Sequence, residues 1–248
     1  MYQFLLKQDP DIVCLQEIAH SLDPNVDPAF LSKDYVDKAT NNLKYSFFSP
    51  TWMIKNFHQK NFHQQENFDF DFGGFLKSGN YIKSRFRILK KTNIFMTNKN
   101  IKVTDWSGWP ERQSKAVQVV DLALPKSKLR ILNYHGIWTK EKIGNQSTLK
   151  ACQKINKLAK EVDYPVIITG DFNLFPDTES MKVFKDSFIS LVDKHQIRTT
   201  RPKTNELSHL EQNVVDYIFV TRGIKVNSFQ VLDTDVSDHL PLILDFDL

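Results

Sequence analysis

The chain has 248 residues, of which 41% are hydrophobic and 25% are charged, and 33 Lys and Arg against 29 Asp and Glu leave a formal net charge of +4. This composition excludes a disordered chain, a collagen-like fibre and a disulfide-stapled secreted mini-protein. No apolar run approaches the roughly 20 residues of a membrane-spanning helix, and an acidic residue follows the N-terminus too closely for a signal peptide. We therefore expect a cytoplasmic monomer without a membrane partner.

The predicted elements, in chain order, are mostly short strands. A short helix over residues 2–7 comes first, and strand-length runs rich in β-branched and aromatic residues follow at 11–16, 45–48, 116–124, 129–133, 166–169, 214–220 and 242–246. The most regular helix begins after Asn145 and Ser147, which can cap it, because apolar residues recur every three or four positions as far as Val162. Another helix is predicted after Thr178. Strands outnumber helices and no linker divides the chain, so we predict one α+β domain over residues 1–248.

Residues 53–75 differ in composition from the rest of the chain. The segment Asn56–Lys60 is nearly repeated as Asn61–Gln65, and each copy carries one histidine, His58 or His63. The two histidines are compatible with a metal site, whereas the mixture of polar and aromatic residues is typical of a loop insertion. We favour the loop.

A basic stretch follows, because residues 72–104 hold eight Lys and Arg and no acidic residue. Three of the cations alternate with uncharged residues and would share one face of a strand; they are Lys83, Arg85 and Arg87. Such a face is compatible with a track for the phosphate backbone of a nucleic acid, with Phe75 and Tyr81 stacking on bases. An ordinary solvated strand face is the alternative.

The strongest functional signal lies where the predicted strand at 166–169 ends. Asp171 and Asn173 follow Gly170, and in an extended chain residues two apart point to the same side. We expect the two side chains to converge beyond the carboxyl end of a strand, where α/β-type sheets tend to place ligands. A carboxylate there binds a water or a hard cation, and an amide binds an oxyanion. An Asx turn that closes the strand would explain the same pair.

Polar groups occupy comparable places at four further positions. Glu17 ends an apolar strand, and Asp216 lies inside another. Asp238 and His239 are adjacent in a turn. Asn133 and His135 share one face of a strand. A buried carboxylate needs a partner, and an imidazole is a natural donor to it. Each position has a structural explanation of its own. Together with Asp171 and Asn173, however, they make five such sites in one chain, which indicates catalysis.

Six segments, in this order, resemble the signature of the endonuclease/exonuclease/phosphatase superfamily, which has the deoxyribonuclease-I-like fold. They are Leu15–Glu17, Gly79–Arg85, Asn133–His135, Gly170–Asn173, Val215–Phe219 and Ser237–His239. The resemblance runs from about Asp9 to the C-terminus. It implies a four-layer α/β/β/α sandwich, in which two mostly antiparallel sheets pack face to face with helices outside. It also implies hydrolysis of a phosphoester with a divalent cation, Mg²⁺ with Mn²⁺ as the alternative.

The resemblance also implies roles for the matching residues. Glu17 would be the main metal ligand, and Asp238 would support a second metal position. Asp171 would orient or deprotonate the attacking water, and Asn173 would bind a phosphoryl oxygen. His239 would contact the scissile phosphate and act as general base or as an electrostatic stabiliser.

Further residues complete the implied site. Asp216 would hold the imidazole of His239, and His135 would bind the phosphate from the other side. The substrate-binding residues would be Asn80, Asn133 and Arg112.

The N-terminus departs from the family pattern. Members open with a strand that carries an Asn, before the strand of Glu17, whereas this chain begins at Met1 with the helix between them. We expect this first strand to be missing, which would expose a sheet edge and weaken metal binding.

The favoured function is a metal-dependent nuclease or nucleic-acid phosphodiesterase, because of the basic stretch. The same chemistry on a small or lipid phosphoester, of the inositol phosphate or sphingomyelin type, is the first alternative. A catalytically impaired binding module is the second, because function does not follow from fold alone.

Overall fold

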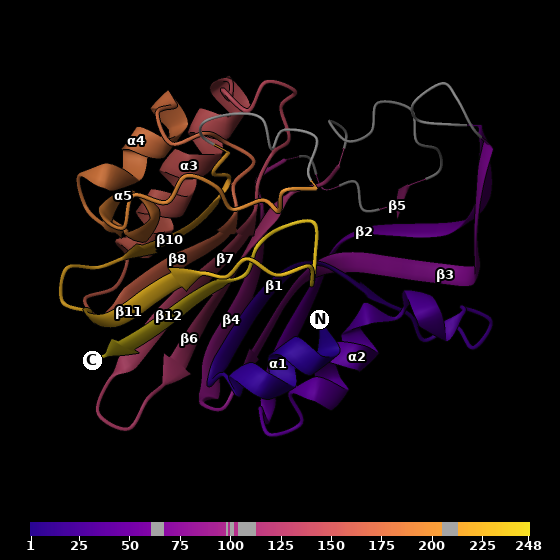
Figure 1. The fold of residues 1–248 in the computed structure, drawn as a ribbon, viewed down its shortest axis with the longest axis horizontal. Coiled ribbons are helices and arrows are strands. Elements are labelled where there is room, and N and C mark those ends of the chain that lie inside the picture. Colours follow the sequence, from indigo (N-terminus) through magenta and orange to yellow (C-terminus); the bar gives the residue numbers. More distant parts are fainter. Residues whose placement is uncertain (61–66, 98, 100–101, 104–112, 205–212) are drawn as a thin grey trace.

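The computed structural model describes residues 1–60, 67–97, 99, 102–103, 113–204 and 213–248, with residues 55–60, 67–73 and 103 described by their backbone. Two sheets pack face to face in the α+β fold predicted from the sequence (Figure 1). The first sheet has the strand order β1 (Ile12–His20), β3 (Asn67–Ser84), β2 (Tyr45–Lys60) and β5 (Lys102–Val103). The second has the order β4 (Arg87–Phe95), β6 (Ala116–Ala123), β7 (Lys128–His135), β8 (Val166–Asp171), β10 (Asp216–Val220) and β9 (Ile189–Ser190).

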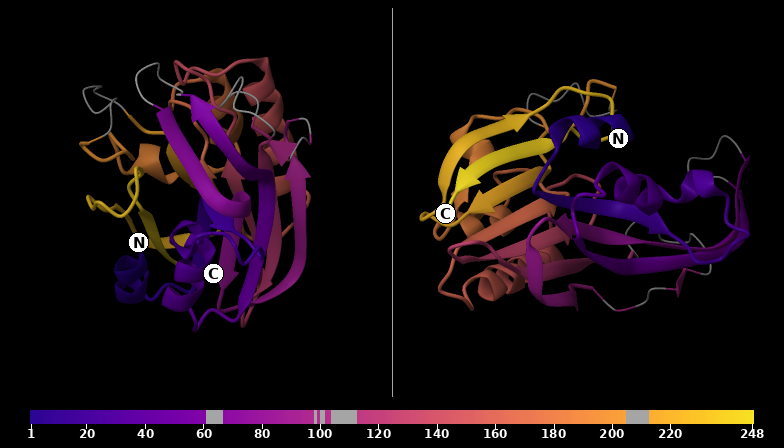
Figure 2. Two further views of the ribbon diagram at one scale, coloured as in Figure 1. Left: turned by 90° about the vertical axis from the view of Figure 1, so that its right-hand side faces the viewer. Right: turned by 90° about the horizontal axis from the view of Figure 1, so that it is seen from below.

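Helices cover the outer faces of both sheets (Figure 2). Helices α1 (Tyr2–Gln8) and α2 (Ser32–Ala39) pack on β1 and β3 through a small apolar core, and a 3-10 helix (Pro28–Phe30) precedes α2. Helices α3 (Gln146–Ala159), α4 (Glu179–Lys185) and α5 (Leu191–Lys194) accompany the second sheet, where the largest apolar core lies. Among the described helices, none is long and apolar enough to cross a membrane.

The strand pairing is mostly antiparallel, as predicted. The β7–β8 and β2–β5 pairs are parallel, and every other pair of named strands is antiparallel. Strands β11 (Lys225–Val231) and β12 (Leu242–Asp247) form a separate two-stranded sheet. Within the described residues β1 pairs with β3 alone. The loss of a strand before Met1 stays a prediction.

Local capping explains where the helices of the second layer begin. The side chain of Asn145 accepts the backbone N–H groups of Ser147 at 2.8 Å and Thr148 at 3.1 Å, which satisfies two free donors at the start of α3. Thr178 caps α4 in the same way, through the N–H of Met181. Both predicted helix starts are confirmed.

Residues 53–60 and 67–75 do not form the predicted loop, and residues 61–66 of that prediction lie outside the described residues. The described parts belong to β2 and β3, which pair with Phe57 opposite Phe70 and Lys60 opposite Asn67. Aromatic and polar residues alternate from Asn67 to Phe72, and this period of two is the pattern of a strand. The side chain of His58 and the whole of His63 lie outside the described residues, so the metal-site alternative is untested.

The three alternating cations do not share the face of one strand. β3 ends at Ser84 and β4 begins at Arg87, so a bend separates them. Lys83 is buried and its ammonium lies 3.0 Å from a carboxylate oxygen of Asp37, and Arg85 Nε lies 3.0 Å from Asp11. The buried and paired charge of Lys83 is poorly placed to follow a nucleic-acid backbone, whereas the ion pair of Arg85 lies at the surface.

Tyr81 is also unable to stack on a base. It is 1% exposed, and its hydroxyl donates to Asp37 at 2.5 Å. Of the two alternatives for this stretch, the phosphate track is therefore not supported at Lys83, and stacking on a base is not supported at Tyr81.

Candidate active site

Three strands of the second sheet bring the central residues of the site together. Asp171 is the last residue of β8, and the strand register places His135 of β7 on one side of it and Asp216 of β10 on the other. All three residues are buried, with exposed fractions of 7 to 8%. The register of two neighbouring strand pairs therefore builds the centre of the site.

The turn after β8 depends on unusual backbone angles. Gly170 has a φ of 132°, and a Cβ atom there would collide with the backbone carbonyl of Tyr134 on β7. Asn173 has a φ of 57°, in the left-handed region. Its backbone N–H donates to Asp171 Oδ1 at 2.7 Å, and its side-chain amide donates to Oδ2 at 3.1 Å. The predicted convergence of Asp171 and Asn173 is confirmed, but an Asx turn produces it and not an extended chain.

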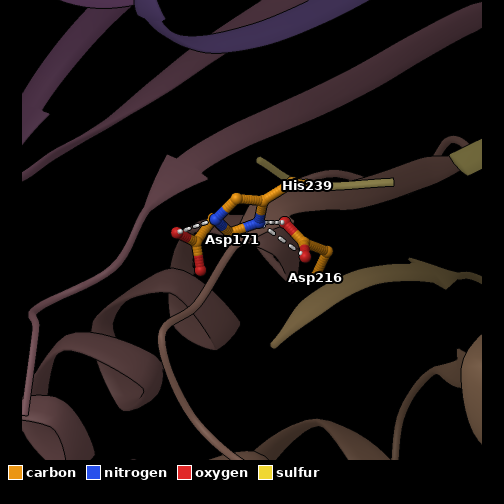
Figure 3. A group of neighbouring side chains, drawn as sticks. All are labelled: Asp171, Asp216 and His239. Atoms are coloured by element: carbon orange, nitrogen blue, oxygen red, sulfur yellow. Dashed lines mark hydrogen bonds and ion pairs between the residues drawn. The ribbon is translucent and has the colours of Figure 1, made fainter. Parts of the chain in front are cut away.

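His239 lies in the turn before β12 and faces Asp216, as predicted (Figure 3). Its Nδ1 is 2.9 Å from both carboxylate oxygens of Asp216, and its Nε2 is 3.8 Å from Oδ2 of Asp171. Burial opposes a charge on the ring, but the carboxylates of Asp216 and Asp171 outweigh it and raise the pKa of His239 to about 9. At neutral pH the ring is an imidazolium that donates to Asp216.

Glu17 reaches the site from the first sheet, at a bulge inside β1. The β1–β3 register shifts between Leu15 and Ile18, and Glu17 has a φ of 55°. A bulge redirects a side chain out of the alternation of its strand. The carboxylate of Glu17 is 60% exposed, and its Oε1 lies 3.7 Å from Nε2 of His135. The sequence indicates a carboxylate at the end of a strand, whereas the structure places it within one.

Amide side chains between the two sheets hold this bulge. Asn133 is fully buried on β7, and its Nδ2 donates to the backbone carbonyl of Leu15 and to Oε1 of Gln118, both at 3.0 Å. Its Oδ1 accepts from Nε2 of Gln16 at 2.6 Å. Asn133 therefore positions the strand that carries Glu17, and its placement does not support the predicted contact with substrate.

A buried lysine, Lys115, contacts the site and was not predicted. Its Nζ lies 2.9 Å from Nε2 of His135. An ammonium only donates hydrogen bonds, so Nε2 accepts. Burial and the charge of Lys115 lower the pKa of His135 to about 3, which makes this imidazole neutral. The sequence around Lys115 carries no pattern that distinguishes it from a surface lysine.

A second unpredicted lysine, Lys142, holds Asn173. Its Nζ donates to Oδ1 of Asn173 at 2.7 Å and lies 4.6 Å from the ring centre of Trp138. Because Oδ1 is engaged in this way, the amide nitrogen of Asn173 faces Asp171. Burial lowers the pKa of Lys142 to about 8, against the opposing charge of Asp171.

The remaining predicted residues lie farther from the centre. Asp238 is 82% exposed in its side chain, and its Oδ2 is 4.0 Å from Nε2 of His239. Asn80 is fully buried and donates to the backbone carbonyl of Ala116 at 2.9 Å, so it joins β3 to the second sheet. Arg112 lies outside the described residues.

The donor set fits a hard divalent cation, which prefers oxygen ligands. Asp171, Asp216 and His239 have ligand atoms within 4.8 Å of one another. Asp216 and His239 already bind each other, and both oxygens of Asp171 accept from Asn173. Glu17 and Asp238 carry the more open carboxylates. Glu17 and Asp238 would therefore hold a cation with fewer hydrogen bonds to break than the Asp216–His239 pair would.

Solved structures with a similar fold cover almost the whole chain. An endonuclease/exonuclease/phosphatase family protein from Leptotrichia buccalis has a TM-score of 0.67 at 14% identity, with 100% of this chain and 91% of that chain covered. A mannosyl-6-phosphatase from Bacteroides thetaiotaomicron has a TM-score of 0.65 at 18% identity, with 100% and 89% covered. TDP2 of D. rerio, complexed with a single-strand DNA product, has a TM-score of 0.65 at 15% identity, with 99% and 89% covered.

These identities are low, so the likeness establishes the fold and not the substrate. Among curated proteins, no sequence matches this chain. The family model named Endonuclease/Exonuclease/phosphatase family matches residues 1–239, which include every segment of the site described above. The chain belongs to the endonuclease/exonuclease/phosphatase family.

Proposed function

We propose that the protein is a divalent-metal-dependent phosphodiesterase that cleaves nucleic acid, acting as a nuclease. Members of its family are phosphoester hydrolases. The observation that carries the proposal is the row of His135, Asp171 and Asp216 on three neighbouring strands, completed by the ion pair between Asp216 and His239. A phosphodiester needs an aligned water and neutralisation of its charge, and this row supplies groups for both.

The chain's own residues divide the work in this proposal. Asp171 accepts a hydrogen bond from the attacking water and orients or deprotonates it. The amide of Asn173, which Lys142 fixes, donates to a phosphoryl oxygen once substrate displaces its contact with Asp171. His239 contributes positive charge at the scissile phosphate, and Asp216 keeps its ring in place. His135 borders the phosphate from the β7 side.

Glu17, with Asp238 nearby, would hold the cation, Mg²⁺ or Mn²⁺. When bound, the cation supplies Lewis-acid polarisation of a phosphoryl oxygen. The exposed carboxylate of Glu17 beside His135 supports this assignment. Metal identity and the second position at Asp238 belong to the proposal.

A small phosphoester is the second candidate substrate. The observation that favours it is the ion pair of the buried Lys83 with Asp37, which removes one cation from the possible nucleic-acid track. A structural neighbour with the same fold is described as a mannosyl-6-phosphatase. Inositol phosphates and sphingomyelin belong to the same class of alternatives.

One assay separates these proposals. Purified protein is incubated with plasmid DNA, single-stranded DNA, RNA, bis(4-nitrophenyl) phosphate and 4-nitrophenyl phosphate, each with Mg²⁺, Mn²⁺ or EDTA. We expect cleavage of a nucleic acid with metal and none with EDTA. Cleavage of the small esters alone would replace the nuclease proposal by the second candidate. No cleavage of any substrate would indicate an impaired member. His239→Ala is the control for a contaminating nuclease.

A further inference from the structure

Lys115 is a buried cation with most of its hydrogen-bonding capacity unused. The residue precedes β6 and is 3% exposed. An ammonium has three N–H donors. Among the described residues its hydrogen-bond partner is the ring of His135, with Nε2 at 2.9 Å and Nδ1 at 3.4 Å. A single ring accepts one good hydrogen bond, so within the described part of the chain two donors of this buried charge have no acceptor, which is costly unless another group supplies one.

The backbone of Lys115 is anchored on both sides. Its N–H donates to Oγ1 of Thr97 at 2.8 Å, and its carbonyl accepts from the N–H of Met96, also at 2.8 Å. The side chain therefore leaves a fixed point at the end of β4 and β6. Strand β7, which carries His135, pairs with β6. The paired strands of the sheet therefore fix the backbone from which the ammonium extends, unlike that of a lysine on a free surface loop.

The ammonium faces the two carboxylates of the site without contacting either. Glu17 Oε1 and Asp171 Oδ2 lie 3.7 Å and 3.9 Å from Nε2 of His135, the same atom that Lys115 approaches. Within the described part of the chain, no carboxylate oxygen lies within 4.0 Å of Lys115 Nζ. The charges of Glu17 and Asp171 nevertheless favour the ammonium form against its burial. The ammonium of Lys115 thus lies on the same side of His135 as these two carboxylates.

His135 itself cannot supply positive charge on this side. Its ring is neutral, and its Nε2 accepts from Lys115 and so has no proton to donate to an anion. On the opposite side of Asp171, His239 is paired with Asp216. A phosphoryl group between the two sides meets the charge of His239 on one side, and on the β7 side it meets the ammonium of Lys115, the cation that the described residues place within hydrogen-bond distance of His135.

We propose that Lys115 is a further catalytic residue whose ammonium donates to a non-bridging phosphoryl oxygen of the substrate, with His135 serving as the acceptor that orients it. This inference rests on the proposed function, since it assumes that the site takes a phosphoester. A fixed ammonium in a buried site stabilises negative charge that develops on the phosphoryl oxygens in the transition state.

The test measures binding of inorganic phosphate to the metal-free protein in EDTA, by calorimetry or by ³¹P line broadening, at neutral pH. We expect Lys115→Met to weaken phosphate binding at least tenfold. Lys115→Gln keeps a hydrogen-bond donor without the charge, so its affinity for phosphate should lie between those of the wild type and Lys115→Met. It also provides a second measurement if the Met variant does not fold. The matched control is Lys90→Met, at an exposed lysine of β4, and it should bind phosphate like the wild type.

The His135→Ala variant distinguishes a direct contact between Lys115 and phosphate from an effect of Lys115 that acts through His135. In His135→Ala protein, Lys115→Met should weaken phosphate binding at least a further fivefold. No additional loss in that background would overturn the inference, because the lysine would then act through the imidazole alone. Wild-type protein that binds no phosphate would overturn it as well.

The phosphate-binding test distinguishes failure of the Lys115 inference from failure of the proposed nuclease function. Binding of inorganic phosphate requires no hydrolysis and no nucleic acid. If no nucleic acid is cleaved while phosphate binding still depends on Lys115, the nuclease proposal fails and the role of Lys115 stands.

Discussion

The two sheets contribute to the site in different ways. The second sheet supplies His135, Asp171 and Asp216 from adjacent strands, and their buried backbones are fixed by continuous pairing. The first sheet supplies Glu17 from a bulge, with a left-handed backbone and an exposed carboxylate. Strand register positions the first group, whereas hydrogen bonds between amide side chains position the second. The difference predicts that the two halves respond differently to mutation.

The largest effect is expected on the second-sheet side, with Asp171→Asn. This change removes the charge that orients the water, so we expect kcat/KM to fall by about 1,000-fold or more. The melting temperature should change little, because the strand pairing that places residue 171 does not involve its side chain. Asp163→Asn, at an exposed acid before β8, is the control. Activity near the wild-type level would exclude Asp171 from the reaction.

A smaller loss is expected on the first-sheet side, with Glu17→Gln. Removing an exposed metal ligand should lower activity by about 100-fold at low Mg²⁺, and higher Mg²⁺ should restore part of it because binding and not chemistry is impaired. A titration of activity against Mg²⁺ concentration measures this. Glu161→Gln, at a comparably exposed acid, is the control. A loss that is independent of metal concentration would assign Glu17 another role.

Asn133→Ala tests whether the amide hydrogen bonds connect the two halves. It leaves Gln16, Gln118 and the carbonyl of Leu15 without their partner, so we expect a loss of about 2–3 kcal/mol in the free energy of unfolding. Activity should fall by about tenfold, since Glu17 loses its fixed position. Asn156→Ala on α3 removes one amide hydrogen bond far from the site. The hypothesis requires that this control keep full activity. Chemical denaturation measures the free energy of unfolding of each variant, and steady-state kinetics measure its activity.

The last prediction concerns the stability of the protein and its dependence on pH, at Lys115. Burial, opposed by Glu17 and Asp171, lowers the pKa of Lys115 from 10.5 to about 8. Between these values the unfolded chain binds the proton and the folded protein does not, so the lysine lowers wild-type stability most below pH 8, and this penalty fades toward pH 10.5.

Lys115→Met should therefore raise the free energy of unfolding at pH 7 by on the order of 2–3 kcal/mol, and the advantage should decline toward pH 10.5. Urea denaturation of both proteins between pH 6.5 and 10.5 measures the difference. Lys90→Met should show no such trend, because Lys90 is exposed. A pH-independent difference for Lys115→Met would mean that the lysine is not a desolvated cation. Gain of stability with loss of phosphate binding is typical of a functional residue.

Much of the fold follows from local patterns. The capped starts of α3 and α4 agree with the prediction, and the strands predicted at 129–133 and 166–169 lie within β7 and β8, because hydrophobic periodicity and capping depend on residues close in sequence. The paired residues 53–60 and 67–75 of β2 and β3 were mistaken for a loop because their many polar side chains outweighed the alternation. Asp171 and Asn173 converge as expected, but a turn with a left-handed residue at Asn173 brings them together and not an extended chain.

By itself, the sequence determined the chemical groups of the site and the strands that carry most of them, because a carboxylate or imidazole next to an apolar run is visible in one dimension. The tertiary structure decided which groups meet. The bulge at Glu17, the interior position of Asn133 and the approach of Lys115 to His135 depend on the packing of two sheets, with partners as far apart as 118 residues. Contacts over such separations are set by register and burial of the whole domain, and no local pattern encodes them.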